Sequence, residues 1–140
     1  MKPITAVIAE DEPLLAAHLR AELAQAWPDL SVVAVATNGV QALDRALVLR
    51  PDVCFLDIRM PGKSGLEVAA AIGSTCHVVF ITAYDQYAIS AFEQGAVDYL
   101  LKPADAARVA LTCQRLRERL EQKPDPMNDL LDKLALRVGG

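Results

Sequence analysis

In Phe55-Leu56-Asp57-Ile58-Arg59-Met60-Pro61-Gly62, a single carboxylate stands between an apolar run and a turn. The apolar run begins at Val53, and Pro61 and Gly62 interrupt regular structure after it. A short apolar run bounded in this way predicts a buried strand. We therefore expect Asp57 in the loop at the carboxyl end of that strand.

Four other apolar runs alternate with helical patterns along the chain. The expected strands cover residues 4–9, 31–36, 53–56, 77–81 and 96–101. The expected helices begin near residues 13, 38, 64, 85 and 104, and the last two end near residues 94 and 121. Near-continuous apolar strands are typical of parallel sheets covered on both faces. The alternation predicts an α/β fold with a mostly parallel sheet and right-handed crossovers.

Residues with strong local preferences predict the ends of two helices. We expect Asn38 to cap the second helix and Pro51 to end it at Arg50. Ser64 and Glu67 have the spacing of a capping box at the start of the third helix.

Apolar residues three or four positions apart predict which face of each helix is buried. The stripes are Leu15, Leu19 and Leu23; Val40, Leu43 and Leu47; Ala88 and Phe92; and Val109, Cys113, Leu116 and Leu120. Each stripe is expected to pack on the sheet.

The composition is that of one globular domain. Of 140 residues, 53% are hydrophobic and 23% are charged. No apolar run approaches the roughly 18–20 residues that a bilayer requires, and the first residues do not resemble a signal peptide, so we expect a cytoplasmic protein. The net charge of −4 argues against nucleic-acid binding by this chain alone, because such proteins usually present a basic face.

The cysteines and histidines form no recognisable motif. Cys54, Cys76 and Cys113 are far apart in the sequence and lie among apolar residues, which favours small buried side chains over metal or redox chemistry. His18 is expected on a helix surface and His77 at the edge of a strand.

The composition changes after Glu121. Lys123-Pro124-Asp125-Pro126 is typical of a linker, because two close prolines block both helix and sheet. We therefore expect one domain over residues 1–122, with residues 123–140 as a linker and lead-in to a C-terminal output domain outside this sequence.

Polar side chains occur where four of the expected strands end. Glu10 and Asp11 follow the first strand, Asp57 the third, Thr82 the fourth and Lys102 the fifth. In open α/β sheets, ligands bind outside the carboxyl ends of the strands. We therefore expect these side chains to converge at one edge.

This set of side chains suits phosphoryl transfer with a divalent cation. Clustered carboxylates repel one another unless a cation is present, and hard oxygen ligands suit Mg²⁺. Glu10, Asp11 and Asp57 would bind the metal and leave an Asp57 oxygen as nucleophile. Lys102 and Thr82 would hold other phosphoryl oxygens, by charge and by hydrogen bond.

Each residue alone has an ordinary structural explanation. Acids such as Glu10, Asp11 and Glu12 are favoured ahead of a helix by the helix dipole. Thr82 alone would be a common strand-end threonine, and Lys102 alone a common surface lysine. Their coincidence at separate strand ends favours a functional site.

Four motifs together resemble the receiver domain of bacterial two-component response regulators. They are Glu10-Asp11-Glu12-Pro13, residues 57–62 with Gly65, Thr82-Ala83 and Lys102-Pro103. The resemblance covers about residues 4–121, with the family landmarks in order. It implies a flavodoxin-like (βα)5 fold, in which five parallel strands in the order 2-1-3-4-5 form a doubly wound sheet.

The resemblance also implies a role for each site residue. Asp57 would accept a phosphoryl group from a phosphohistidine on a sensor histidine kinase, and Lys102 would bind that group. Mg²⁺ would be held by Glu10, Asp11, Asp57 and the backbone carbonyl of Arg59. The domain would be a phosphoacceptor that assists its own phosphorylation and dephosphorylation, rather than an enzyme.

Further implied features concern switching. Thr82 and Tyr99 match the family pair in which the hydroxyl moves toward the phosphate and the aromatic ring follows inward. The peptide bond between Lys102 and Pro103 would be cis, a geometry that proline makes accessible. Glu10 departs from the family pattern, whose first acid is most often Asp. Metal binding is expected to survive, either directly or through a water molecule.

The segment Thr82-Ala83-Tyr84-Asp85-Gln86-Tyr87-Ala88, with its continuation to Pro103, resembles receivers that carry a LytTR-type (LytR/AlgR-like) DNA-binding output. The implied partners are the sensor kinase and, on activation, a second copy of the chain through the fourth and fifth helices and the fifth strand. DNA would be bound through the output domain, and no membrane contact is implied.

Three alternatives differ in class. A stand-alone receiver acting through protein contacts would not need the linker. A Mg²⁺-dependent phosphatase with an aspartyl nucleophile usually has a second acid two residues later, where this chain has Arg59. A flavin-binding electron carrier would need phosphate-cradling loops, and the acids after the first strand would repel its phosphate.

Overall fold

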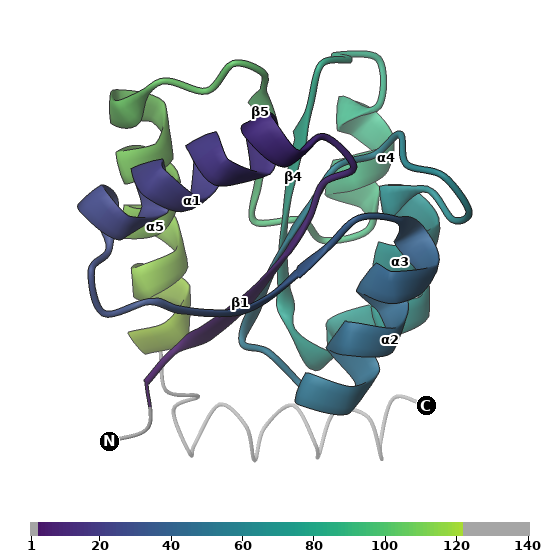
Figure 1. Ribbon diagram of the computed structural model, residues 1–140, viewed down its shortest axis with the longest axis horizontal. Coiled ribbons are helices and arrows are strands. Elements are labelled where there is room, and N and C mark those ends of the chain that lie inside the picture. Colours follow the sequence, from purple (N-terminus) through teal and green to yellow (C-terminus); the bar gives the residue numbers. More distant parts are fainter. Residues whose placement is uncertain (1–2, 122–140) are drawn as a thin grey trace, which may run out of the picture.

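The computed structural model describes residues 3–121, and its elements alternate along the chain (Figure 1). The strands are β1 (Thr5–Ala9), β2 (Ser31–Ala36), β3 (Val53–Leu56), β4 (His77–Thr82) and β5 (Asp98–Leu101). The helices are α1 (Pro13–Ala26), α2 (Gly39–Leu49), α3 (Gly65–Ile72), α4 (Ala88–Glu93) and α5 (Ala106–Glu121), with a 3₁₀ turn, η1, at Gly73–Thr75. The predicted linker and lead-in at 123–140 lie outside the described residues.

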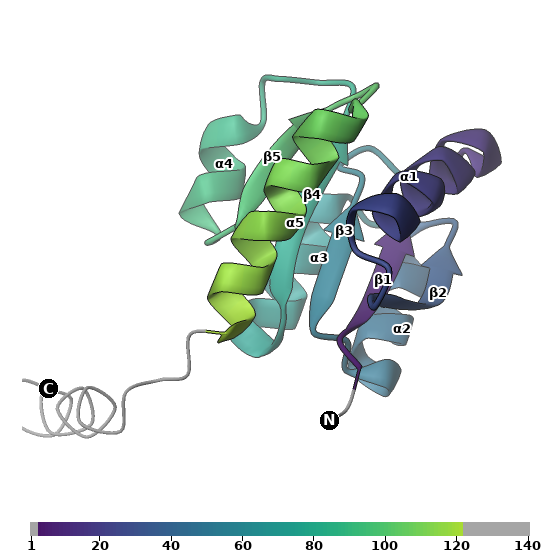
Figure 2. The same cartoon turned by 90° about the vertical axis from the view of Figure 1, so that its left-hand side faces the viewer.

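The strands form one parallel sheet in the order β2-β1-β3-β4-β5, which confirms the predicted topology. Helices α1 and α5 cover one face, and α2, α3 and α4 cover the other (Figure 2). The order of the strands reverses between β1 and β3. Ligands bind at such a reversal in open α/β sheets.

Each face of the sheet has its own apolar core. The largest fully buried side chain under α1 and α5 is Phe55, and the largest on the opposite face is Phe80. Neighbouring strand residues alternate between the two cores, so the strands read as continuous apolar runs in the sequence. Within residues 3–121, no helix is long and apolar enough to cross a membrane.

Local sequence signals set several helix ends as predicted. The Asn38 side chain accepts a hydrogen bond from the Gln41 backbone, and Ser64 and Glu67 form a reciprocal capping box. Arg50, the residue before Pro51, closes α2 with a left-handed backbone conformation (φ 47°).

The predicted apolar face of α2 is wrong at two of its three residues, whereas Leu43 is half-buried against the core. The helix buries Gly39, Ala42 and Ala46, whereas Val40 and Leu47 are 57% and 58% exposed. Small residues let the helix approach its neighbours closely: a Cβ atom on Gly39 would lie 1.9 Å from the Lys63 carbonyl oxygen. Close approach therefore selects the small face over the larger stripe.

Helix α4 is shorter than predicted, because its first turn begins at Ala88 rather than Asp85. Tyr87 precedes it with non-helical backbone angles, and no side chain caps this end. Ala91 is its buried residue, whereas Phe92, expected on the buried face, is 60% exposed. The loop before α4 is correspondingly longer.

Candidate functional site

The site lies at the carboxyl edge of the sheet, where β1, β3, β4 and β5 end side by side. The backbone N–H of Asp57 donates to Ala9 (3.0 Å), and that of Glu10 donates to Ala36 (2.9 Å). These bonds continue the ladder just past the strand ends and hold both acids at the edge. Asp57 and Glu10 are buried, and Asp11 is exposed.

The structure brings together the three acids that the sequence singles out. One carboxylate oxygen from each of Glu10, Asp11 and Asp57 lies within 4.8 Å of the others. Burial raises the pKa of Glu10 to about 7, against the lowering effect of its hydrogen bond to Lys102. The cluster therefore has the character of an anionic pocket that a cation would relieve.

Lys102 supplies a positive charge to this pocket from the end of β5. Its Nζ lies 2.8 Å from Asp57 Oδ2 and also contacts Glu10 Oε1. Hydrogen bonds and charges of these two acids outweigh burial and raise the pKa of Lys102. The backbone N–H of Lys102 donates to the Thr82 carbonyl (2.8 Å), and the following bond to Pro103 is cis.

Thr82 ends β4 with its side chain fully buried. Within residues 3–121, its hydroxyl has no hydrogen-bond partner, and it is the one buried side-chain polar atom in that state. An unpaired buried hydroxyl is destabilising by about 1–3 kcal/mol. Such an atom at a strand end marks a place where a ligand oxygen could bind.

The donor set fits a divalent cation with oxygen preferences. Three carboxylates with oxygens within 4.8 Å of one another provide hard ligands, and the exposure of Asp11 leaves that side open to water. Mg²⁺ typically binds through one or two carboxylates and keeps several waters. The cluster is therefore compatible with a Mg²⁺ site.

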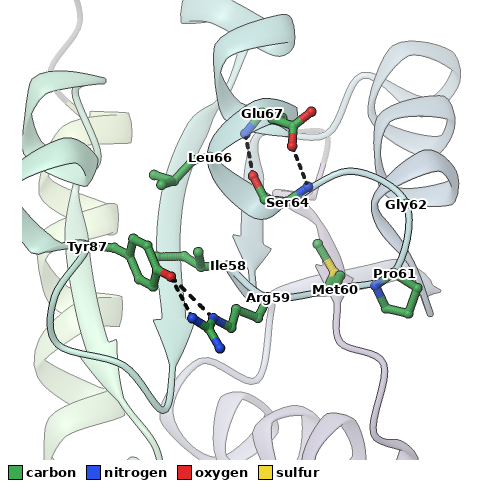
Figure 3. Close-up of a pocket in the computed structure, with 9 residues that line it drawn as sticks. All are labelled: Ile58, Arg59, Met60, Pro61, Gly62, Ser64, Leu66, Glu67 and Tyr87. Atoms are coloured by element: carbon green, nitrogen blue, oxygen red, sulfur yellow. Dashed lines mark hydrogen bonds between the residues drawn. The ribbon is translucent and has the colours of Figure 1, made fainter.

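Arg59 joins the loop after β3 to the loop after β4, beside a groove of about 470 Å³ (Figure 3). Its guanidinium donates two hydrogen bonds to the Tyr87 hydroxyl, at 3.1 and 3.2 Å, and stacks 4.2 Å from the centre of the Tyr84 ring. The same hydrogen bonds lower the pKa of Tyr87. We name Arg59, Tyr84 and Tyr87 the arginine–tyrosine clamp.

Tyr99 connects β5 to this clamp. Its hydroxyl donates to the backbone carbonyl of Tyr84, and its half-buried ring packs at a tilt of 50° and 6.4 Å from Phe80. The Tyr99 side chain thus lies against the core on one side and the β4–α4 loop on the other. The sequence pointed to Tyr99 but gave no signal for Tyr87.

A second polar cluster was missed by sequence reasoning. Asp98 is buried at the start of β5, where Arg108 binds both of its oxygens at 2.7 and 2.8 Å, and Arg115 and Thr112 bind one of them. Burial opposes ionisation of Asp98, but these hydrogen bonds outweigh it and lower the pKa to about 2. Asp98 also accepts from the Tyr99 N–H (2.9 Å), so the cluster anchors the neighbouring residue.

Comparison with known proteins identifies the family. The chain matches the response regulator receiver domain over residues 6–114. An uncharacterized response regulatory protein of Vibrio cholerae is 52% identical over 134 residues, covering 94% of this chain and 51% of that protein. The transcriptional regulatory protein BtsR of Escherichia coli K12 is 46% identical over 117 residues, covering 82% and 48%. The chain spans about half the length of these curated relatives.

Solved structures agree with this result. The REC domain of AraT, a response regulator from Geobacillus stearothermophilus, is 35% identical with a TM-score of 0.80, and the match covers 86% of this chain and 98% of that one. The fold is that of a receiver domain, with five parallel strands in the same order. The chain belongs to the response regulator receiver domain family of two-component systems.

Proposed function

We propose that Asp57 is the phosphoacceptor of this receiver domain and takes its phosphoryl group from a phosphohistidine on a sensor histidine kinase. The supporting observation is the position of the Asp57 carboxylate, which lies within 4.8 Å of two further acids and 2.8 Å from the Lys102 ammonium. A carboxylate so placed has neighbours for both the incoming negative charge and a metal.

In this proposal an Asp57 oxygen attacks phosphorus, so that a P–O bond forms while the P–N bond to the kinase histidine breaks. Bound Mg²⁺, held by Glu10, Asp11, Asp57 and the carbonyl of Arg59, would supply charge neutralisation. Lys102 stabilises one phosphoryl oxygen by charge. The domain thus promotes its own modification by positioning and electrostatics, which dominate phosphoryl transfer in general.

The readout proposed for the modified state runs through Thr82 and Tyr99. The unpaired Thr82 hydroxyl would donate to a phosphoryl oxygen and move toward it. Tyr99 would then leave the Tyr84 carbonyl and turn inward, which changes the surface formed by α4 and β5. Phosphorylation adds about −1.5 to −2 charges, which is sufficient to bias a two-state element of this kind.

The proposed output is a C-terminal DNA-binding domain of the LytTR type, controlled by a homodimer that forms on activation. The relative BtsR is a transcriptional regulatory protein about twice the length of the matched region. The dimer is supported by exposed apolar side chains on α4, β5 and α5, namely Ile89, Phe92, Leu101 and Leu111. The sequence of the gene beyond Gly140 tests the output: absence of a basic, β-rich segment would remove the LytTR assignment.

Incubation with Mg²⁺ and a small phosphodonor tests the phosphoacceptor. Intact-mass spectrometry should show one added, acid-labile phosphoryl group in the native chain and in Asp44→Asn, whose side chain is 58% exposed on α2. Asp57→Asn should show none. Equal uptake by Asp57→Asn would show that Asp57 is not the acceptor.

A further inference from the structure

Two cysteines that are 22 positions apart in the sequence meet in the folded chain. The Sγ atoms of Cys54 and Cys76 are 3.5 Å apart. Cys54 lies in β3, and Cys76 directly precedes β4. Cys54 is the register partner of Val78, and Cys76 is two residues before Val78, so both thiols point to the same face of the sheet.

The two thiols differ in their access to solvent. Cys54 is fully buried, whereas Cys76 is half-buried at the margin of the core under α2, α3 and α4. Both are free thiols in this structure, as is Cys113, which is buried on α5 in the core of the opposite face of the sheet. A reagent in solution would therefore reach Cys76 first and find Cys54 directly behind it.

The pair is not part of a metal site. In the described part of the chain, the acids of the phosphoacceptor pocket are the one cluster of three or more metal-ligating side chains. The hydrogen bond between the two thiols lowers the pKa of Cys76, against the opposing effects of burial and of the Asp52 charge. The same hydrogen bond, together with burial, raises the pKa of Cys54. Cys76 is thus the more readily ionised thiol, and the thiolate is the reactive form.

We propose that Cys54 and Cys76 are a redox-modification site, which a hydroperoxide converts reversibly to an intramolecular disulfide. This proposal rests on the contact between the two sulfurs, on their position on the same face of the sheet, and on the greater solvent access of Cys76. It is independent of the role proposed for Asp57. It places this modification on β3, the strand that Asp57 directly follows.

The chemistry uses one peroxide and two thiols. The Cys76 thiolate attacks one peroxide oxygen, so that an S–O bond forms and the O–O bond breaks, releasing water or an alcohol after protonation. The Cys54 sulfur then attacks the Cys76 sulfenic acid. The S–S bond forms, the S–O bond breaks, and water leaves with the proton from Cys54. Two thiols lose two electrons in total, and the peroxide gains them.

The resulting bond would tie β3 to the residue before β4 and close a loop that includes α3 and η1. A cross-link restricts the unfolded chain more than the folded one. The oxidised chain should therefore unfold at a higher temperature, by roughly 5 °C or more. Dithiothreitol should reverse this shift.

Peptide mapping under non-reducing conditions tests the proposal directly. After treatment of the 140-residue chain with hydrogen peroxide, we expect a linked peptide pair that contains Cys54 and Cys76, lacks two hydrogens and separates on reduction. Cys113→Ser should behave like the native chain, because Cys113 lies on α5, in the core on the opposite face of the sheet. Cys76→Ser and Cys54→Ala should each lose the linked pair and the rise in melting temperature.

Other results would overturn the proposal. A disulfide that involves Cys113, or one between two chains, would show that the observed contact does not direct oxidation. Accumulation of sulfinic acid at Cys76 with reduced Cys54 would show that Cys54 cannot resolve the intermediate. If Cys54→Ala fails to fold, Cys76→Ser alone decides, because its site tolerates partial solvent contact.

Discussion

Lys102 reaches across the sheet edge to Asp57, with Nζ 2.8 Å from Oδ2, and contacts Glu10 with the same ammonium group. Its side chain is 12% exposed, so this one charge is shared between two buried acids with little screening by water. Lys102 therefore stabilises the pocket as well as serving the proposed phosphoryl group. The two roles can be measured separately.

Lys102→Met should lower the free energy of unfolding by roughly 1–3 kcal/mol without Mg²⁺, because buried acids lose their cation. Protonation of Glu10, whose pKa is already raised, limits the loss. Saturating Mg²⁺ should restore most of it by replacing the missing charge. Urea unfolding with and without Mg²⁺ measures both effects, with Lys63→Met as the control. Equal stability of the native and Lys102→Met proteins without Mg²⁺ would contradict the neutralising role.

Gly65→Ala should disturb Asp57, the proposed phosphoacceptor, directly. A Cβ atom at this position would lie 2.1 Å from the Asp57 carbonyl oxygen, which is backbone and cannot rotate away. We expect a loss of about 2–3 kcal/mol in unfolding free energy and slower uptake from a phosphodonor. Gly73→Ala is the steric control, because a Cβ there meets open space and costs only the strain of a φ of +67°. If both variants take up phosphate at the native rate, contact with Gly65 does not position Asp57.

Arg59→Met should release the arginine–tyrosine clamp while leaving the core intact, since Arg59 is an exposed side chain. The pKa of Tyr87 should rise, because the guanidinium that lowers it is gone. Amide hydrogen exchange should accelerate between residues 83 and 87, and the melting temperature should change little. Two-dimensional NMR measures the first two effects. An unchanged Tyr87 titration would show that the clamp does not persist in solution.

Asp98→Asn should destabilise the domain at neutral pH by about 2 kcal/mol, the value that corresponds to a carboxyl pKa lowered from 3.8 to about 2. A carboxyl pKa that is lower in the folded than in the unfolded state contributes stability that is fully present above the unfolded-state pKa. That contribution is lost as the pH falls through the folded-state pKa. The native protein should therefore lose this contribution between about pH 4 and pH 2. In Asp98→Asn that part of the pH profile should be flatter, as measured by thermal unfolding, whereas Asp44→Asn should retain it. Superimposable native and Asp98→Asn profiles would contradict the assignment.

The convergence of acids was predictable, because parallel apolar strands place their following residues at one edge whatever their distance in sequence. The strand order was expected from the family resemblance. The buried face of α2 was not predictable from its periodicity. Periodicity favours the larger side chains, whereas close approach at Gly39 and Ala42 favours the smaller ones. Tyr87 was missed because its contact with Arg59 depends on how two loops meet. The partners of Asp98 were missed because they depend on how α5 lies against β5. Sequence separation concealed the contact between Cys54 and Cys76 in the same way.

Thr82→Val should make the unmodified domain more stable, by about 1 kcal/mol, because it replaces an unpaired buried hydroxyl with a methyl group of the same shape. Thr112→Val is the matched control, since the Thr112 hydroxyl is equally buried but donates to Asp98 at 2.8 Å, and its loss should be destabilising. Under the proposed switch, Thr82→Val should still accept phosphate on Asp57 but should not move Tyr99. Tyrosine fluorescence before and after phosphodonor addition measures that movement. A Thr82→Val protein that is less stable than the native one would show that the hydroxyl is already satisfied in the resting domain. A native fluorescence change in Thr82→Val would show that Tyr99 responds without this hydroxyl.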